Sequence, residues 1–129
     1  MRIQIAVAVL AIAAATAGCS TAPILNVSDA VVASPTGKSA NNEQVRAAIV
    51  RAGVALGWQL KDEDPNLLVG TLQLRTHSAV VEIPYSASNY SIKYRSSTNL
   101  DEKAGVIHKN YNGWIQNLNK GINAQLSLP

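Results

Sequence analysis

The sequence predicts an α+β fold, a two-layer sandwich in which an antiparallel sheet of about five strands carries two helices on one face. Three observations predict it. Apolar and polar residues alternate over most of residues 67–95, two other segments repeat apolar residues at helical spacing, and the order is strand, helix, four strands, helix. A sheet with one apolar face needs a cover, and two amphipathic helices supply it.

The first strand is expected at residues 24–32, and a loop rich in Pro, Gly, Ser and Asn follows at 33–42. Asn41 or Asn42 then caps a helix, because a short side-chain oxygen accepts a free N–H of the first turn. Gly57 ends it. One stripe of apolar residues defines its buried side: Val45, Ala48, Ile49, Ala52 and Leu56.

Four strands are expected next, in a run where side chains alternate with period two. The segment "WQLKDED" starts one strand and ends in an acidic turn, with "DPN" as the breaker. Residues 67–75, 78–85 and 90–95 supply the other three. Outward parity falls on five polar side chains: Gln73, Arg75, Glu82, Lys93 and Arg95.

The turns between these strands suggest two registers. A loop at Ser86–Asn89 places Tyr85 opposite Tyr90, Ile83 opposite Ile92, and Glu82 opposite Lys93 as an opposite-charge pair. A tight turn at Thr76-His77 would place Leu74 opposite Ala79 and Leu72 opposite Val81.

A last helix is predicted by apolar residues at three- and four-residue steps. They are Ile107, Tyr111, Trp114, Ile115, Leu118, Ile122 and Leu126. Gly113, Gly121 and many Asn residues lower its intrinsic helicity, so packing of the apolar stripe against the sheet must hold it.

The N-terminus has the pattern of a secretory signal peptide. Arg2 precedes an apolar run of about 13 residues, short of the roughly 20 that span a bilayer, and small residues close the segment. Residues 16–19, Thr-Ala-Gly-Cys, resemble the bacterial lipobox, which implies cleavage after residue 18 and acylation of Cys19. A stray cysteine near an ordinary cleavage site is the alternative.

The lipobox resemblance implies a division of the chain and a location. Residues 1–18 are the signal peptide, residues 19–23 a lipidated tether, and residues 24–129 a single periplasmic domain. Ser20 stands where an Asp would suggest inner-membrane retention, so the resemblance implies a lipid anchor in the outer membrane, facing the periplasm. More than one acyl chain is needed for stable anchoring, and a triacylated cysteine provides it.

Charge and cysteine content exclude several classes of protein. The chain has 11 basic and 8 acidic residues and no basic run, so no nucleic-acid partner is expected. Cys19 is the only cysteine, and once acylated it leaves no thiol for a disulfide or a thiolate metal site.

No residue pattern points to catalysis, a metal or a cofactor. His77 and His108 are the only histidines, and they read as a turn histidine and a helix-start histidine. Metal ligands must converge in threes or fours, and no such spacing is present. Ser96-Ser97 lacks the elbow of a nucleophile, and Asp62–Asp64 reads as a solvated turn. We therefore expect no catalytic residue, no metal, no cofactor and no enzymatic activity.

Two sets of side chains leave a binding role open. Trp58, Tyr85, Tyr90 and Tyr94 belong to the core or line a cleft for a glycan or lipid; with no Phe in the chain, Tyr is expected in the core. Arg75, Lys93 and Arg95 form a solvated sheet face or a small basic patch for an anionic partner such as cell-wall polymer or lipid headgroups.

Four motifs resemble a set of small bacterial lipoproteins without assigned activity. They are Gly57-Trp58, R-x-H-x-A-x-V at residues 75–81, Y-S-I-x-Y at 90–94 and I-H-x-x-Y-N-x-W at 107–114. The likeness covers about residues 48–126 and implies an envelope lipoprotein without naming a reaction. It adds His77, His108 and Asn112 to the possible binding residues.

The sequence thus predicts a membrane-anchored periplasmic lipoprotein that acts as a non-enzymatic binding or interaction module of the bacterial envelope. Its partners would be the membrane, through the anchor, and an envelope protein or an anionic cell-wall or lipid partner. A carrier of a small glycan or lipid in a cleft between sheet and helices is the alternative, and a cell-wall hydrolase is a third.

Overall fold

The computed structural model describes residues 20–33 and 39–128. The expected signal peptide and Cys19 lie outside the described residues. The elements are β1 (Thr21–Pro23), β2 (Val27–Val31), α1 (Asn42–Ala55), β3 (Gln59–Asp64), β4 (Leu67–Leu74), β5 (His77–Pro84), β6 (Asn89–Thr98), β7 (Val106–His108) and α2 (Lys109–Leu126).

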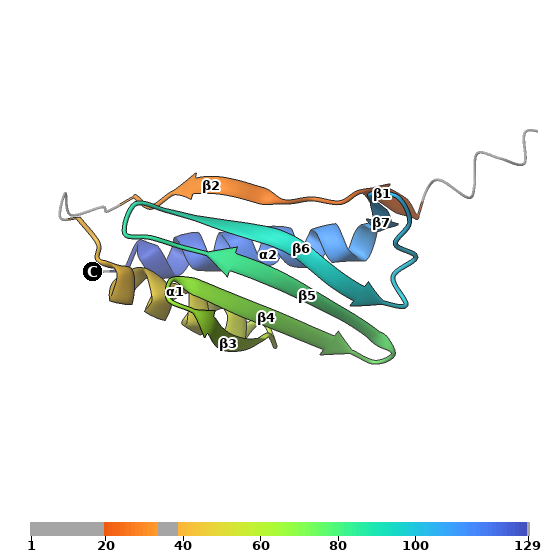
Figure 1. Cartoon of the computed structure of the whole chain (residues 1–129), viewed down its shortest axis with the longest axis horizontal. Helices are drawn as coiled ribbons and strands as arrows, with labels where there is room; N and C mark the ends of the chain where they lie inside the picture. Colours follow the sequence, from red (N-terminus) through yellow and green to blue (C-terminus); the bar gives the residue numbers. More distant parts are fainter. Residues whose placement is uncertain (1–19, 34–38, 129) are drawn as a thin grey trace, which may run out of the picture.

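Five strands form one antiparallel sheet in the order β2-β6-β5-β4-β3, and β1 pairs with β7 in a separate two-stranded sheet. Both helices lie on the same face of the larger sheet (Figure 1). The predicted α+β sandwich is confirmed. Among the described residues, no helix is both long and apolar enough to cross a bilayer.

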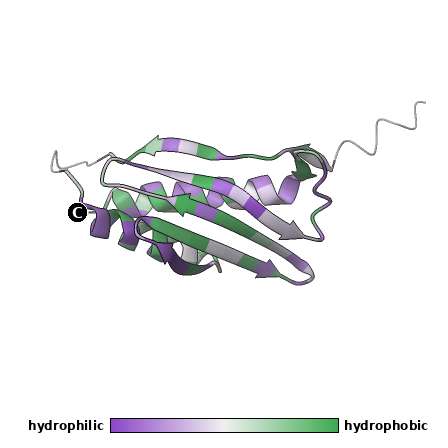
Figure 2. Cartoon of the chain, in the orientation of Figure 1, coloured by the Kyte–Doolittle hydropathy of each residue, from purple (hydrophilic) through white to green (hydrophobic). Residues whose placement is uncertain are grey.

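The core lies between the sheet and the helices. Bands of apolar and polar residues alternate along the strands (Figure 2), because successive side chains of a strand point to opposite faces. The fully or nearly fully buried apolar residues are Val45, Ile49, Ala52, Trp58, Leu68, Leu72, Ala79, Val81, Ile83, Tyr85, Tyr90, Ile92, Leu100, Ile107, Tyr111, Ile115, Leu118 and Ile122. Trp114, in the middle of the predicted stripe, is only partly buried and packs against the edge of this core.

The predicted ends of α1 are confirmed. The Asn41 side chain accepts a hydrogen bond from the Gln44 backbone N–H (2.8 Å), and the Gln44 side chain accepts one from the Asn41 N–H (2.9 Å). This reciprocal cap satisfies two backbone donors that the helix itself leaves open. Gly57, just past the helix, has a φ of 91°, which residues with a Cβ rarely adopt.

One hairpin register was predicted correctly and the other was wrong. Tyr85 faces Tyr90 and Glu82 faces Lys93, as expected. Between β4 and β5, however, Leu74 pairs with His77 rather than Ala79, because Arg75 adopts a left-handed φ of 57° and the turn falls one residue earlier, which shifts the pairing by two residues. A shift of two residues returns every side chain to its predicted face, so the core of this hairpin is as expected except at the end of β4, where Leu74 is exposed.

The segments before α1 and α2 differ from the prediction. The expected strand at 24–32 is reduced to β2, with a bulge between Val27 and Ala30 where Asp29 has a φ of 51°. Thr21–Pro23, expected as part of a tether, form β1 and pair with β7. Ile107 belongs to β7, and the helix begins two residues later.

Candidate functional site

The six residues singled out by the sequence for binding separate into two groups. Lys93 and Arg95 lie on β6 and belong to the outer face, the side of the five-stranded sheet opposite the helices. The other four lie toward the end of the domain where β1 and β7 pair: Arg75, His77, His108 and Asn112. The "β1–β7 end" is defined here as Ser20, residues 75–77, residues 99–105 and residues 108–109.

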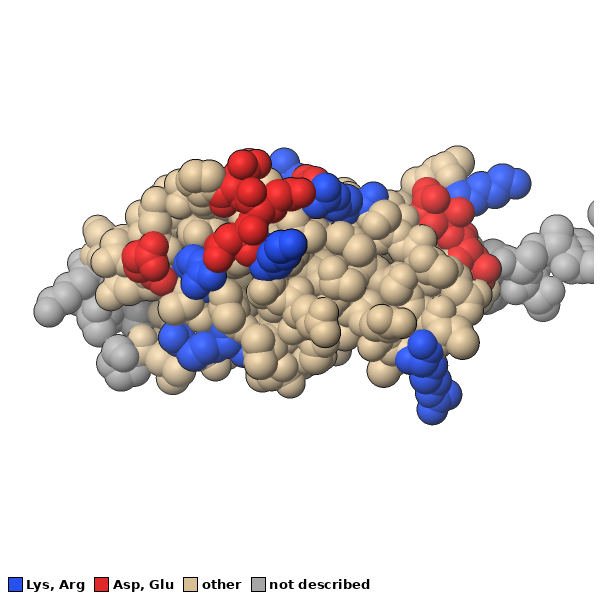
Figure 3. Space-filling model, turned by 60° about the horizontal axis from the view of Figure 1, so that its bottom comes forward, with Lys and Arg blue, Asp and Glu red and all other residues tan. Residues whose placement is uncertain are grey.

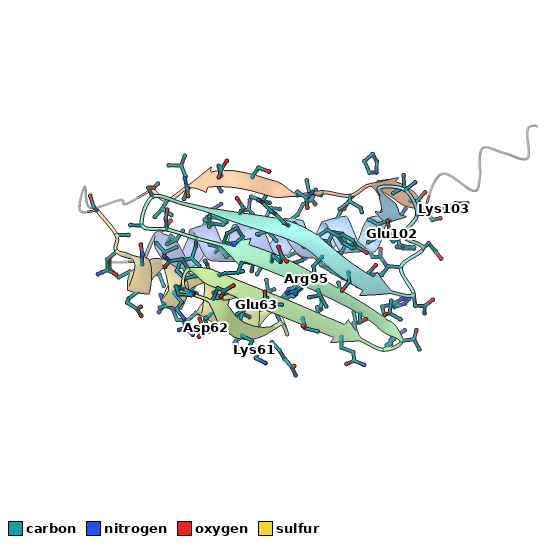
Figure 4. All side chains as sticks on the ribbon, in the orientation of Figure 1. Lys61, Asp62, Glu63, Arg95, Glu102 and Lys103 are labelled. Atoms are coloured by element: carbon teal, nitrogen blue, oxygen red, sulfur yellow. The ribbon has the colours of Figure 1, made fainter. Side chains whose placement is uncertain are left out.

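Arg95 is held between two carboxylates on the outer face. Its guanidinium donates to both carboxylate oxygens of Glu63 at 3.0 Å, and its Nε lies 3.6 Å from Glu82 (Figure 4). The hydrogen bonds to Glu63 raise the pKa of Arg95. A planar guanidinium matches a carboxylate in this two-bond geometry, which fixes the long side chain across the sheet.

Of the two alternatives for Arg75, Lys93 and Arg95, the structure favours dispersed charges on a solvated face over a single basic patch. Lys93 lies opposite Glu82, Arg95 is paired, and Arg75 sits in the β4–β5 turn, away from both. On the face that Figure 3 shows, basic and acidic side chains lie next to one another.

The acidic segment read as a solvated turn is part of β3. Asp62 accepts two hydrogen bonds from the Arg46 guanidinium of α1, at 2.9 and 2.6 Å, and these bonds lower the pKa of Asp62. Glu63 binds Arg95. The turn itself is made by Pro65 and Asn66. Residues 61–64 are all charged and exposed, so no alternation marked this segment as an edge strand.

His77 helps to hold the β6–β7 loop against the β4–β5 turn. Its Nδ1 lies 2.6 Å from the Asn99 carbonyl oxygen; since a carbonyl only accepts, this nitrogen carries the proton and donates. The Asn99 amide in turn donates to Thr76 Oγ1 at 2.9 Å. No sequence pattern singled out Asn99, whose role depends on the arrangement of the loop.

His108 is a helix-start histidine, as the sequence predicted. Its Nδ1 accepts from the Asn110 backbone N–H at 3.1 Å and caps α2. Its own backbone N–H donates to the Leu100 carbonyl at 2.8 Å, and it pairs with Thr21 across the β1–β7 ladder. His77 and His108 therefore bind neighbouring residues of one loop, each through Nδ1 or the backbone.

Asn112 holds the segment between β1 and β2. Its amide oxygen accepts from the Leu25 backbone N–H at 3.0 Å, and its amide nitrogen donates to the Pro23 carbonyl at 2.9 Å. The side-chain amide thus offers one donor and one acceptor to the main chain, as a neighbouring strand would. The structure gives Asn112 a role in packing the N-terminal segment onto α2.

The aromatic residues considered for a ligand cleft belong to the core. Trp58 is 3% exposed, Tyr90 1% and Tyr85 8%, and Tyr94 is partly buried. The Tyr90 hydroxyl donates to the amide oxygens of Asn119 (2.5 Å) and Asn123 (3.1 Å) of α2. The core interpretation of Trp58, Tyr85 and Tyr90 is confirmed.

Tyr111 differs from Tyr90 because its buried hydroxyl is not hydrogen-bonded within the described residues. Its ring is fully buried and packs edge-on against Tyr94, with centroids 5.6 Å apart. Burial raises the pKa of Tyr111, because the charged phenolate would lose its hydration.

Within residues 20–33 and 39–128, no three His, Cys, Asp or Glu side chains gather as potential metal ligands. No protein-family model matches the chain, and neither the curated proteins nor the solved structures gave a significant match.

Proposed function

We propose that this chain is a lipid-anchored protein of the bacterial envelope, related to the small lipoproteins that its motifs resemble. Its folded domain acts in the periplasm as a non-enzymatic binding or interaction module. The anchor is Cys19: its thiol receives a diacylglycerol, residues 1–18 are then removed, and its new amine is acylated. The membrane is the outer membrane.

The position of Cys19 carries this proposal. It lies directly behind a basic residue, a short apolar run and three small residues, and it is the only cysteine available for acylation. The structure next to it supports the proposal: the Ser20 carbonyl accepts from the Lys109 N–H at 2.9 Å, and Thr21 lies in β1. The residue after the proposed anchor is thus hydrogen-bonded within the domain.

The side chains at the candidate positions support a binding role over a reaction. His77, His108 and Asn112 are engaged with the main chain of neighbouring segments, so their hydrogen bonds already serve the fold. A general base must be within hydrogen-bond reach of a substrate proton, and a nucleophile needs such a base. The surface offers instead exposed charges and loops on a rigid sheet.

The experiment is fractionation of cells that express Cys19→Ser next to the natural sequence. The natural chain is expected in the outer-membrane fraction, with a mature mass that includes acyl groups and a diacylglycerol. The variant is expected in the soluble or uncleaved precursor form, because serine has no thiol to alkylate. Ser20→Ala serves as the matched control, since it changes the neighbouring residue and leaves the thiol. Equal sedimentation of Cys19→Ser and the natural chain with outer membranes would contradict the proposal.

A further inference from the structure

The folded domain starts directly at the proposed anchor. Ser20 is the residue after Cys19, and both its carbonyl and the β1–β7 ladder that follows are hydrogen-bonded within the domain. One residue of chain reaches at most about 3.6 Å. Acyl chains on Cys19 would therefore hold Ser20 at the depth of the lipid headgroups, while this single tether leaves the domain free to tilt unless the rest of the β1–β7 end also binds the membrane.

Hydrogen bonds connect the rest of the β1–β7 end to Ser20 and β1. Ile24 donates to the Gly105 carbonyl and His108 to the Leu100 carbonyl, both in the β6–β7 loop. From the same loop, Asn99 binds His77 and Thr76 at the β4–β5 turn. The start of β1, the β6–β7 loop and the β4–β5 turn thus form one continuous end of the molecule (Figure 1).

The β6–β7 loop contains a hydrogen-bonded tight turn. Lys103 and Val106 exchange two backbone hydrogen bonds, of 2.9 and 3.1 Å, around a two-residue turn. Both central residues, Ala104 and Gly105, have positive φ, the conformation of a tight hairpin turn. The loop therefore presents Lys103 and Glu102 from a fixed backbone at this end (Figure 4).

The exposed side chains at this end suit phosphate-bearing lipid headgroups. Arg75, Lys103 and Lys109 are exposed, and none forms an ion pair with a carboxylate of the described residues. The acidic side chains of the β6–β7 loop, Asp101 and Glu102, only partly offset them. Basic residues next to an anchor are attracted to anionic headgroups, and a guanidinium matches a phosphate in two-bond geometry.

An apolar side chain accompanies these cations. Leu74, beside Arg75 at the end of β4, is 49% exposed. Exposed apolar side chains next to basic ones are found where proteins enter the boundary between headgroups and acyl chains. On the outer face, by contrast, Arg95 is already bound to Glu63 and Glu82.

We propose that the β1–β7 end is a membrane-docking surface, which rests on phospholipid headgroups of the leaflet that carries the anchor. This inference rests on the proposed acylation of Cys19 and adds a fixed orientation to it. Arg75, Lys103 and Lys109 bind lipid phosphates, and Leu74 enters the interface. The β5–β6 loop and the C-terminus lie at the other end of the domain and point away from the membrane (Figure 1).

The test measures the depth of two labels on acylated protein in vesicles of phosphatidylethanolamine and phosphatidylglycerol. Because Cys19 is the only natural cysteine and is blocked by acylation, Glu102→Cys or Ser88→Cys provides the only free thiol for a fluorophore. Glu102 lies at the β1–β7 end and Ser88 in the β5–β6 loop. A spin-labelled headgroup lipid is expected to quench the label at Glu102 several-fold more than the label at Ser88.

Charge reversal provides the second arm. Arg75→Glu with Lys103→Glu is expected to lower the quenching at position 102 several-fold, whereas Lys61→Glu, on β3, leaves it unchanged. Circular dichroism verifies that the variants fold. Acylated protein with equal quenching at both labels, or no response to charge reversal, overturns the docking surface and leaves the anchor standing. A purified chain whose mass carries no acyl group overturns the proposed function itself, and the docking surface falls with it.

Discussion

The hairpin β4–β5 and the segment β1–β2 belong to the same small domain but are held by different means. β4 and β5 pair through eight consecutive positions, from Leu67↔Pro84 to Leu74↔His77. β2 pairs with β6 at only three positions, interrupted by a bulge. Hydrogen bonds from side chains replace the missing ladder bonds. Asn26 accepts from the Tyr94 N–H and Ser91 accepts from the Asp29 N–H. The Asn112 amide binds the Leu25 N–H and the Pro23 carbonyl.

This difference shows two ways in which a sequence specifies strands. Alternation over many residues determines the hairpins, because every second side chain enters the core and any change of face would expose it. The segment β1–β2 depends on single amides and hydroxyls that replace missing ladder bonds, because buried backbone groups must find partners. Loss of one residue is therefore expected to have different consequences in the two regions.

The largest effect is expected where the regular sheet meets the helices. Leu68 of β4 is completely buried. Leu68→Ala should reduce the free energy of unfolding by about 2–5 kcal/mol, because it removes apolar contacts and leaves a cavity. Urea unfolding measures it. A loss below about 1 kcal/mol would mean that the site collapses freely and that the sheet is not the rigid part of the molecule.

Asn112→Ala tests the other region. It leaves the Leu25 N–H and the Pro23 carbonyl without their partner, so we expect a loss of about 1–3 kcal/mol. Hydrogen exchange should localise the damage, with faster exchange at Leu25 and unchanged exchange in β4 and β5. Asn110→Ala is the matched control in the same helix turn. Unchanged exchange at Leu25 would show that the segment is held without the amide.

The two regions also differ in how far the sequence predicts them. The period-two pattern of residues 67–95 predicted β4, β5 and β6 and the faces of their side chains, even where the β4–β5 register was wrong by two residues. That register depends on the left-handed φ of Arg75. The turn contains no Gly or Asn that would have indicated this conformation. The roles of Asn26 and Asn112 could not be predicted from the sequence either, because each side chain accepts a hydrogen bond from a backbone N–H far away in the chain.

The candidate site shows the same limit. Composition and parity indicated which cations are exposed, but the partners of Arg95 depend on the twist that brings Glu63 across the sheet. Likewise, His77 and His108 are at the positions expected of them, yet their shared loop follows only from the fold. Sequence reasoning found the residue types and faces, and the structure supplied their neighbours.

Tyr90 and Tyr111 allow a buried hydroxyl that is hydrogen-bonded to be compared with one that is not. Tyr90→Phe removes hydrogen bonds to Asn119 and Asn123, with an expected loss of about 0.5–1.5 kcal/mol. Tyr111→Phe removes a hydroxyl that has no partner among the described residues, so it should be neutral or stabilising. Urea unfolding of the pair at pH 7 compares them. A larger loss for Tyr111→Phe would indicate a bound water or a further partner at that hydroxyl.

The same tyrosines make a prediction for alkaline pH. Burial raises the pKa of Tyr111 and Tyr90, so the folded protein retains their protons at a pH where the unfolded chain, near pH 10, releases them. Stability is therefore complete below about pH 10 and falls as the pH rises beyond it. Unfolding followed between pH 8 and pH 11 should show this fall, and Tyr111→Phe should reduce it. An equal slope in Tyr111→Phe would exclude Tyr111 as a source.

The smallest effect is expected on the outer face. Arg95→Gln removes the ion pairs with Glu63 and Glu82, but all three side chains are about 40% exposed. Exposed ion pairs contribute about 0–1 kcal/mol, so unfolding should change by less than that and the difference should shrink in high salt. Lys93→Gln, on the same strand, removes an equal charge without breaking these pairs and is the control. If Arg95→Gln cost about 2 kcal/mol or more while Lys93→Gln cost nothing, the bridge to Glu63 would be holding β3 onto the sheet. Single side-chain contacts would then contribute to the stability of the regular sheet as much as they do around β1 and β2.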